Sequence, residues 1–434
     1  MGSLGALSGC ASAVDAPADR AAPGDIVLFQ VTPLPSYRLI AADADNRQPV
    51  AGPLTVVPER ADSKASNSST RVATATWRQP GDALTLDWHS TRYAALKIAG
   101  GAPLDLRPYV QQGTVEFDLN VHQLAKGGIN FRIGCGADCE RKVPYLLPAR
   151  AAAGKGWQHV ALSMQCFARE GDDFSAITEP FALEGTVGGN VSIANIVIRR
   201  QGTPNADCPD YRTASVTPGM LNEASAIDWW LPRHEAKLDE VRALRASGTN
   251  PELVFVGDSI THFWERAGAK VWERNYARYH ALNLGFGGDR TENILWRLQH
   301  GEVDDIAPKV AVVMMGTNNT GHRQEAPERT AAGIKRNLDE LRRRLPRTKI
   351  LLLAIFPRQA TPDGFARRLN EQTNAIIANY ADNEHVFFLN INQAFLQPDG
   401  TLSKEIMPDL LHPNGRGYEL WAEAMRPELE RLLK

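Results

Sequence analysis

The sequence predicts a two-part α/β chain: an antiparallel β-sandwich followed by a doubly wound domain on a five-stranded parallel sheet. Three observations predict it. With 434 residues, the chain is too long for a single ordinary core. In the first half, apolar residues alternate with polar ones, which is typical of half-buried antiparallel strands. In the second half, continuous apolar runs alternate with helical patterns, which is typical of parallel strands covered by helices.

The overall composition excludes several classes of function. Apolar residues make up 43% and charged residues 23% of the chain, close to the averages of globular proteins. The formal net charge is -2 and there is no long Lys/Arg run, so we expect no nucleic-acid partner. No stretch approaches the roughly 18 apolar residues that a membrane span requires, so we expect no membrane span.

Residues 1–24 are rich in Ala, Gly, Asp and Pro without apolar periodicity, and we expect them to form a flexible tether. The run that ends in Cys10 looks like a lipobox, where bacterial lipoproteins are cut and acylated. It predicts a lipid anchor at Cys10 on a secreted, periplasmic or outer-membrane-attached lipoprotein. A chance match is the alternative, because almost no hydrophobic segment and no positive charge precede the run.

Residues 25–205 are predicted to form the sandwich. Val115, Phe117, Leu119 and Val121 alternate with polar residues, as expected for a half-buried strand. The same alternation recurs at Leu84, Leu86 and Trp88, at Ile129, Phe131 and Ile133, at Val160, Leu162 and Met164, and at Ile196 and Ile198. Short strands separated by Gly, Pro and Asn turns favour an antiparallel sandwich.

Two residue types in this half allow two interpretations each. Cys135, Cys139, Cys166 and Cys208 form an even set that suits two disulfides of open connectivity, made in an oxidising compartment. A zinc site is the less favoured alternative, because no paired C-x-x-C knuckles or nearby His pair is present. Trp77, Trp88 and Trp157 could stack on sugar rings, but their strand positions favour core packing.

Residues 206–224 contain Pro209 and Pro218 without clear periodicity and are predicted to be a linker. Residues 225–434 then begin with an amphipathic helix over 231–246. The predicted strands are 253–256, 281–284, 310–315, 350–356 and 386–390, and the helices between and after them are 291–300, 327–344, 364–380 and 416–433. In such sheets, ligands bind beyond the carboxyl ends of the strands.

Ser259 lies where that rule places a ligand site, because the apolar strand 253–256 runs directly into Gly257-Asp258-Ser259. A serine hydroxyl is a poor nucleophile until a base removes its proton. Asp409 and His412 stand three residues apart near the end of the chain, a spacing that lets the carboxylate reach Nδ1 while Nε2 faces the serine. The three residues are therefore a candidate catalytic triad. An ordinary turn and a surface histidine are the alternatives.

Two further strand ends offer donors for an oxyanion. Gly288 belongs to the glycine-rich run after strand 281–284, where a backbone N–H can approach a substrate closely. Asn318 follows strand 310–315 and can supply a side-chain amide. A phosphate-binding loop and a polar turn are the alternatives. A nucleotide site is disfavoured, because no Gly-Lys-Ser/Thr follows the first strand and the G-x-G-x-x-G spacing is absent.

Gly-Asp-Ser, Gly-Gly-Asp, Gly-Thr-Asn-Asn and Asp-x-x-His, in this order, resemble the SGNH (GDSL-type) hydrolases, and the run 280–289 resembles the platelet-activating-factor acetylhydrolase group. The resemblance implies that Ser259 is nucleophile and first oxyanion donor, with Gly288 and Asn318 as the other donors. It also implies that His412 is the base and Asp409 its orienting partner. In the acetylhydrolase group, bulky residues restrict the acyl pocket at the positions of Ile260 and Leu411, which favours acetyl esters.

The first domain, including the stretch 104–109, resembles the galactose-binding-like module of bacterial exo-glucosidases, which implies a place near polysaccharide. Together the two resemblances predict a serine esterase that deacetylates polysaccharide such as plant xylan, or its oligosaccharides, without a cofactor. A lipid or general short-chain acyl esterase is one alternative. A catalytically inactive binding protein is another, and it is disfavoured because every catalytic position is filled.

Overall fold

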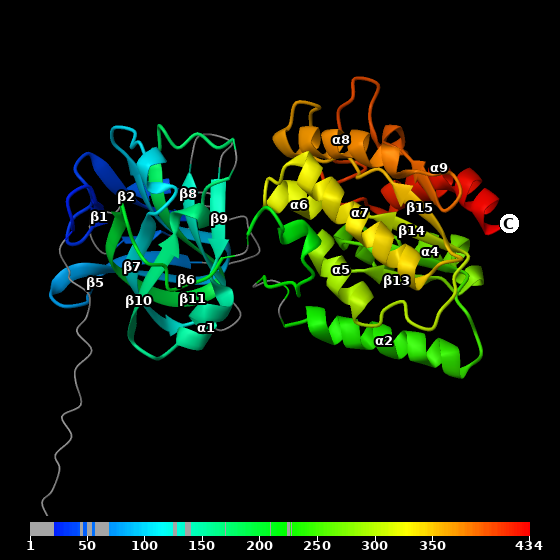
Figure 1. The fold of residues 1–434 in the computed structure, drawn as a ribbon, viewed down its shortest axis with the longest axis horizontal. Helices are drawn as coiled ribbons and strands as arrows, with labels where there is room; N and C mark the ends of the chain where they lie inside the picture. The colour runs from blue at the N-terminus through cyan, green and yellow to red at the C-terminus, as the bar shows by residue number, and fades with distance from the viewer. Residues whose placement is uncertain are drawn as a thin grey trace, which may run out of the picture.

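The computed structural model describes residues 21–43, 47–49, 54–56, 69–124, 128–134, 140–169, 171–208, 210–223, 226 and 228–434. Two sheets organise the molecule, one in each half of the chain (Figure 1). The first is antiparallel and curled, and the second is parallel and covered by helices on both faces. The predicted fold class is confirmed for both parts.

The antiparallel sheet has 11 strands in the described part of the chain. They are β1 (Ile26–Phe29), β2 (Tyr37–Asp43), β3 (Arg47–Pro49), β4 (Leu54–Val56), β5 (Ser69–Thr76), β6 (Pro80–Gly100), β7 (Thr114–Gln123), β8 (Gly128–Gly134), β9 (Glu140–Pro144), β10 (Trp157–Ser163) and β11 (Glu179–Arg199). The main path runs β10-β7-β11-β6-β2-β3. One helix, α1 (Leu146–Ala152), lies between β9 and β10 in the chain and contacts β7 and β8.

Two long strands let this one sheet enclose a core. The first part of β11 pairs with β8 and its last part pairs with β7, while β6 pairs with β11 along most of its length. The ladder is irregular at Val187, whose φ is 66°, and such bulges bend a strand and increase its twist. Beside the bulge, Gly185 leaves room for the fully buried Trp88 ring, which a Cβ would meet at 2.4 Å.

The other two tryptophans singled out from the sequence lie outside this core. Trp77 and Trp157 are half-buried, and their ring centroids are 6.5 Å apart in an edge-to-face arrangement. The expectation of core packing is thus confirmed for Trp88, while the other two rings pack against each other.

Cys166 and Cys208 form a disulfide, which agrees with the predicted oxidised state for these two and excludes them as zinc ligands. Cys135, Cys139 and the lipobox-like run at Cys10 lie outside the described residues. Within the described ranges, no group of three or more His, Cys, Asp or Glu side chains is placed to hold a metal ion. Over the same ranges, no helix combines the length and apolarity that crossing a bilayer requires.

The second sheet has the order β13-β12-β14-β15-β16, with every neighbouring pair parallel. Its strands are β12 (Leu253–Gly257), β13 (Leu282–Gly285), β14 (Val310–Met314), β15 (Lys349–Leu353) and β16 (Val386–Leu389). The long helices are α2 (Trp230–Ala246), α5 (Thr291–Gln299), α7 (Pro327–Arg344), α8 (Phe365–Ile377) and α9 (Gly415–Leu433). All five predicted strands and all five predicted helices are present at nearly the expected positions.

A separate hydrophobic core covers each face of the parallel sheet. On one face α5 and α7 pack on residues such as Val254 and Val313, and on the other α4 (Ala269–Asn275) and α9 pack on residues such as Phe255 and Val312. Because both faces are covered, the strands read as continuous apolar runs. All five strands run in the same direction, so their carboxyl ends meet at a single edge of the sheet.

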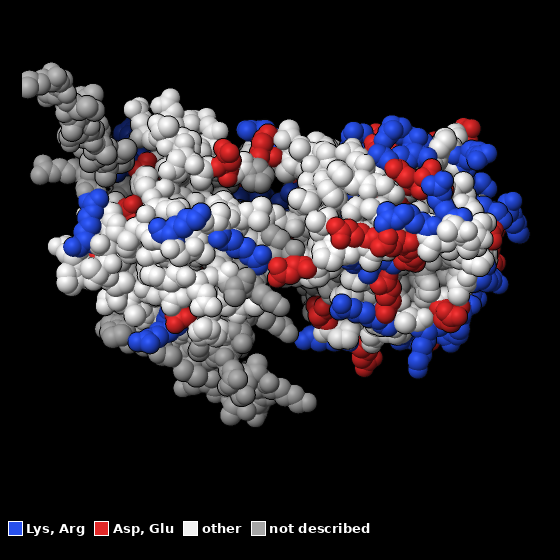
Figure 2. Space-filling model, turned by 90° about the horizontal axis from the view of Figure 1, so that it is seen from below, with Lys and Arg blue, Asp and Glu red and all other residues white. Residues whose placement is uncertain are grey.

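The segment between the two sheets is fastened to the parallel domain. Ser215 donates a hydrogen bond to Glu325 (2.6 Å), and its carbonyl accepts one from Thr291 (3.0 Å). The sandwich also contacts the parallel domain directly, because Arg141 Nη1 donates to Gln324 Oε1 (3.1 Å) and Arg169 donates to the Arg323 carbonyl. Figure 2 shows charged side chains crowded on the parallel domain and sparse on the visible face of the sandwich.

Candidate active site

Ser259 stands at the carboxyl end of β12, the strand between β13 and β14. Asp258 caps the short helix α3 (Ser259–His262) by accepting a hydrogen bond from the Ile260 N–H (3.0 Å). Gly257 allows the tight strand-to-helix turn, because a Cβ there would lie only 2.4 Å from the Met314 carbonyl. Ser259 therefore lies just beyond the carboxyl edge of the sheet, and 7% of its surface is exposed.

The structure brings Ser259, His412 and Asp409 together. His412 Nε2 lies 2.8 Å from Ser259 Oγ, and His412 Nδ1 lies 2.6 Å from Asp409 Oδ2. Asp409 Oδ1 also accepts hydrogen bonds from the backbone N–H groups of Leu411 (3.1 Å) and His412 (2.7 Å). Leu410 has φ of 59°, and this left-handed residue turns the chain so that His412 folds back onto Asp409.

The Asp409 carboxylate is held in its charged form. Burial alone would raise its pKa, but the hydrogen bonds from the His412 ring and from two backbone N–H groups outweigh it, so the pKa of Asp409 is lowered. An ionised Asp409 accepts a hydrogen bond from the protonated Nδ1 of His412. The lone pair of Nε2 then faces Ser259 Oγ. This is the arrangement in which an imidazole can accept the serine proton.

Gly288 and Asn318 come from the two strands that flank β12. Gly288 has φ of 82°, a conformation that glycine adopts without strain. Asn318 lies in the first turn of α6 (Thr317–His322), and its Nδ2 donates to the Asp289 carbonyl (2.9 Å). An amide nitrogen carries two hydrogens, so the second N–H remains for a substrate. The hydrogen bond joins the loops after β13 and β14, which places both candidate donors at the edge that holds Ser259.

The loop of Gly288 is tied to the turn that follows β12 by two hydrogen bonds that the sequence does not indicate. The Phe286 N–H donates to the Gly257 carbonyl (3.1 Å), and the Gly287 N–H donates to His262 Nδ1 (3.2 Å). Burial, followed by the positive charge of Arg233, lowers the pKa of His262 to about 4. The ring is therefore neutral at pH 7 and can accept the Gly287 hydrogen bond.

Beneath the site, buried carboxyls support the loops. Burial raises the pKa of Asp289 to about 7, although Arg297 Nε (2.8 Å) and Trp230 Nε1 (2.5 Å) both donate to it. Arg297 is fully buried and also bonds Glu302. This network fixes the end of the glycine loop from below, and none of its hydrogen bonds reaches Ser259.

The two residues expected at the acyl pocket differ in exposure. Ile260 is fully buried in the core that α9 covers, whereas Leu411 is only partly buried beside His412. Of the two, Leu411 is the side chain that keeps part of its surface exposed. The acyl pocket itself stays a prediction.

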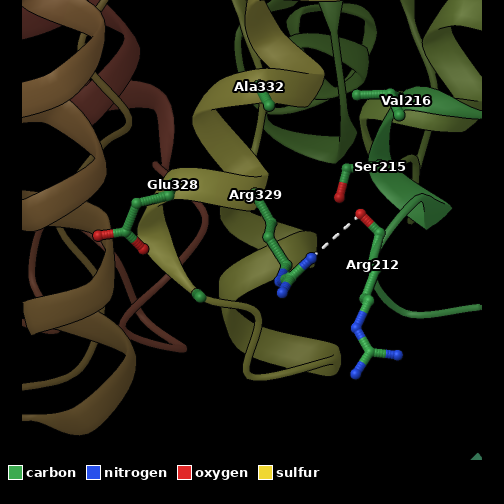
Figure 3. A pocket seen from close by; sticks show the side chains of 7 residues that line it. Arg212, Ser215, Val216, Glu328, Arg329 and Ala332 are labelled. Atoms are coloured by element: carbon green, nitrogen blue, oxygen red, sulfur yellow. Dashed lines mark hydrogen bonds between the residues drawn. The ribbon is translucent and has the colours of Figure 1, made fainter. Parts of the chain in front are cut away.

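A surface pocket of about 450 Å³ lies elsewhere, where the segment 212–216 meets the start of α7 (Figure 3). Arg329 Nη1 donates to the Arg212 carbonyl across it (3.1 Å), and Glu328 also lines it. No member of the Ser259–His412–Asp409 set lines this pocket, so we do not assign substrate binding to it.

Comparisons with known proteins agree with the division of the chain into two domains. The GDSL-like lipase/acylhydrolase family matches residues 255–420, and the galactose-binding domain-like family matches residues 52–198. Over 184 residues the chain is 37% identical to platelet-activating factor acetylhydrolase IB subunit alpha1 of Homo sapiens, covering 42% of this chain and 77% of the relative. Over 218 residues it is 31% identical to subunit alpha2 of Rattus norvegicus, covering 50% and 90%.

Among solved structures, an exo-1,3/1,4-beta-glucanase from a Pseudoalteromonas species matches with a TM-score of 0.34 and 16% identity. That match covers 43% of this chain and 22% of the glucanase. The family models and the curated relatives confirm both resemblances predicted from the sequence.

Proposed function

Since this chain belongs to the GDSL-like lipase/acylhydrolase family and is a carboxylic ester hydrolase, we propose that it removes acetyl groups from carbohydrate. The observation that carries the proposal is the hydrogen-bonded set Ser259–His412–Asp409 at the edge of the sheet. The acetylhydrolase names of the relatives and the partly buried Leu411 beside His412 support acetyl as the acyl group. The galactose-binding domain-like family of the first half supports a sugar as the alcohol.

The mechanism that we propose uses this geometry. Ser259 Oγ attacks the ester carbonyl while His412 Nε2 accepts its proton, and Asp409 stabilises the resulting imidazolium. The oxyanion accepts hydrogen bonds from the N–H groups of Ser259 and Gly288 and from the Asn318 amide. When the tetrahedral intermediate collapses, the bond between the acyl carbon and the sugar oxygen breaks. The sugar oxygen receives the proton from His412, and the sugar leaves as an alcohol. Acetyl-Ser259 remains, and water activated by His412 releases acetate and regenerates the enzyme.

A test of the substrate uses acetylated xylan oligosaccharides, with mass spectrometry before and after treatment. We expect loss of acetyl groups with wild-type protein and an unchanged spectrum with Ser259→Ala. Acetylated xylan that survives under conditions where the wild type cleaves 4-nitrophenyl acetate would contradict the proposal.

The second candidate is a lipid acetyl esterase, favoured by the word lipase in the description of the matching family and by the acetylhydrolase names of the relatives. A phospholipid acetyl ester in the same assay separates the two, since our proposal predicts a higher kcat/KM on the acetylated oligosaccharide. An inactive binding protein would leave every ester intact.

We also propose that the protein works in an oxidising compartment outside the cytoplasm. The Cys166–Cys208 disulfide supports this, because disulfides persist mainly in secreted and periplasmic proteins. A lipid anchor at Cys10 remains part of this proposal, and mass spectrometry of the N-terminal peptide from the native host tests it.

A further inference from the structure

Three aromatic rings lead from the glycine loop to the catalytic histidine. The Trp229 and His262 ring centroids are 5.8 Å apart, as are those of His262 and Phe263. The Phe263 ring then lies 4.9 Å from the ring of His412. We call Trp229, His262 and Phe263 the aromatic shelf.

The two outer rings of the shelf are anchored in the protein and partly exposed, whereas His262 between them is buried. Trp229 packs against a small cluster that includes Trp230 and Phe286, and Phe263 packs against the core under α9. Phe263 is nevertheless only half-buried, and Trp229 is partly exposed as well. An aromatic ring that is partly open beside a reaction centre offers a rigid apolar face to a ligand at low cost in side-chain entropy.

His262, in the middle of the shelf, has a defined state. Its Nδ1 accepts the Gly287 hydrogen bond, so a neutral ring carries its proton on Nε2. A Cβ on Gly287 would lie 3.4 Å from the Trp229 ring, so the glycine loop itself runs along the shelf. The shelf therefore borders the loop of Gly288 on one side and His412 on the other.

The chemistry of the reaction decides which part of the substrate meets the shelf. His412 returns a proton to the leaving oxygen, so the alcohol portion of the ester must lie next to the imidazole. Phe263 is in ring contact with that imidazole. The acyl carbonyl, in contrast, must face the oxyanion donors.

We propose that the aromatic shelf is the subsite for the sugar ring that carries the acetyl group, an inference that rests on the proposed function. A pyranose presents a face of C–H groups that packs on an aromatic ring, while its hydroxyls point outward to polar neighbours. Such neighbours adjoin the shelf: the Arg266 guanidinium lies over the Phe263 ring, 5.0 Å from its centroid, and Arg233 and Glu265 pair beside His262. These charged neighbours suit hydroxyls and are unsuited to a lipid chain.

The test compares two substrates that differ only in the alcohol. Acetylated xylobiose carries a sugar ring, whereas the alcohol of ethyl acetate is too small to cover the shelf. For Trp229→Ala and Phe263→Ala, we expect the ratio of kcat/KM on xylobiose acetate to that on ethyl acetate to fall about tenfold, mainly through KM. Trp229→Phe keeps a ring and should retain the ratio within about threefold.

Leu231→Ala is the matched control, because this residue lies on the helix that follows Trp229 and is 39% exposed. It should leave the ratio unchanged. If both alanine variants keep the wild-type ratio while the wild type cleaves both substrates, the inference fails and the proposed function stands. If the wild type cleaves ethyl acetate but no sugar ester, the proposed function fails, and the inference with it.

Discussion

In the mechanism that we propose, catalysis depends on a short chain of hydrogen bonds from Ser259 through His412 to Asp409. The surroundings of each residue suit its proposed role. The turn after β12 exposes the serine oxygen, the left-handed Leu410 folds His412 back, and two backbone N–H groups fix the carboxylate. Because the three partners are already aligned, little reorganisation is needed when the substrate binds.

Asn318→Ala removes the only side-chain donor proposed for the oxyanion. We expect kcat to fall about 100-fold with KM for 4-nitrophenyl acetate nearly unchanged, because the amide is needed most when negative charge develops. Steady-state kinetics check this. A variant that loses binding instead of turnover would contradict the assignment.

His262→Gln tests the neutral histidine beside the glycine loop. The unfolded chain protonates this histidine near pH 6.5, but the folded chain only near pH 4. Between these values the unfolded state binds more protons, so the wild-type free energy of unfolding falls as the pH drops from 6.5 to 4. Glutamine does not titrate, and its carbonyl can still accept the Gly287 N–H.

Urea denaturation between pH 7 and pH 4.5 should show wild type losing stability relative to His262→Gln, by on the order of 1–3 kcal/mol. The charged groups acting on the ring are Arg233, Glu265, Arg266 and Lys237. Asp258 and Asp289, whose pKa values burial raises to about 7, act in the opposite direction but are present in both proteins, so their contribution cancels. Parallel curves for the two proteins would be the contrary result.

Local pattern accounts for the candidate triad and donors. Ser259, Gly288 and Asn318 each follow an apolar strand, and Asp409 and His412 are recognised by their spacing of three residues. Local pattern does not account for the aromatic shelf. Trp229 precedes a helix and Phe263 follows one, so neither occupies a periodic position, and only the fold brings them to His412. His262 could be noticed as the last residue of the helix that Ser259 begins, but its bond to Gly287 depends on the register of β12 with β13.

At the scale of secondary-structure elements, the loops after β12, β13 and β14 form one structural unit because the three strands are in register. Gly257 is paired with Gly285 and Met314, so the three loops leave the sheet at the same height. The long strands and helices were predictable, since each buries a periodic apolar pattern. The short helices α3, α4 and α6 were not, because so few residues carry too little periodicity.

Gly285→Ala should disturb this unit. A Cβ at Gly285 would lie 2.2 Å from the His262 nitrogen and 2.5 Å from the Thr261 carbonyl carbon, and both are backbone atoms of α3, the helix that Ser259 begins. We expect a loss of at least about 2 kcal/mol in the free energy of unfolding, together with lower kcat.

Gly219→Ala is the control for that substitution, since no atom lies within 4 Å of a Cβ there. Its stability should change by less than about 0.5 kcal/mol. Equal effects of the two substitutions, measured by urea denaturation, would show that the packing at Gly285 does not matter.

For the molecule as a whole, two features join the sandwich to the parallel domain. One is the connecting segment, which Ser215 fixes by its hydrogen bond to Glu325, and the other is a set of polar contacts such as Arg141–Gln324. The switch from period-two alternation to apolar runs predicts two parts, and both are present. The contacts between them were not predictable, because they are hydrogen bonds between polar groups far apart in the sequence, such as Arg141 in β9 and Gln324. The Cys166–Cys208 pairing was likewise left open, since four cysteines allow three connectivities.

Cys208→Ser tests how the disulfide contributes to the sandwich. The bond closes a loop between residues 42 positions apart, so its removal should lower the free energy of unfolding by about 4 kcal/mol. The turnover of 4-nitrophenyl acetate should remain, because the disulfide packs against the core of the sandwich, whereas Ser259 follows β12 of the parallel sheet. Denaturant unfolding with and without reductant checks this, and a variant as stable as the oxidised wild type would contradict it.

The central claim is that Ser259 forms the covalent bond to the acyl group, and labelling by a fluorophosphonate tests it most directly. Intact-mass and peptide mass spectrometry should find one adduct on Ser259 in the wild type, and none in Ser259→Ala. The label should also be lost, or form far more slowly, in a variant with His412→Ala. An active wild-type protein that takes the label on another residue, or takes none, would contradict the account.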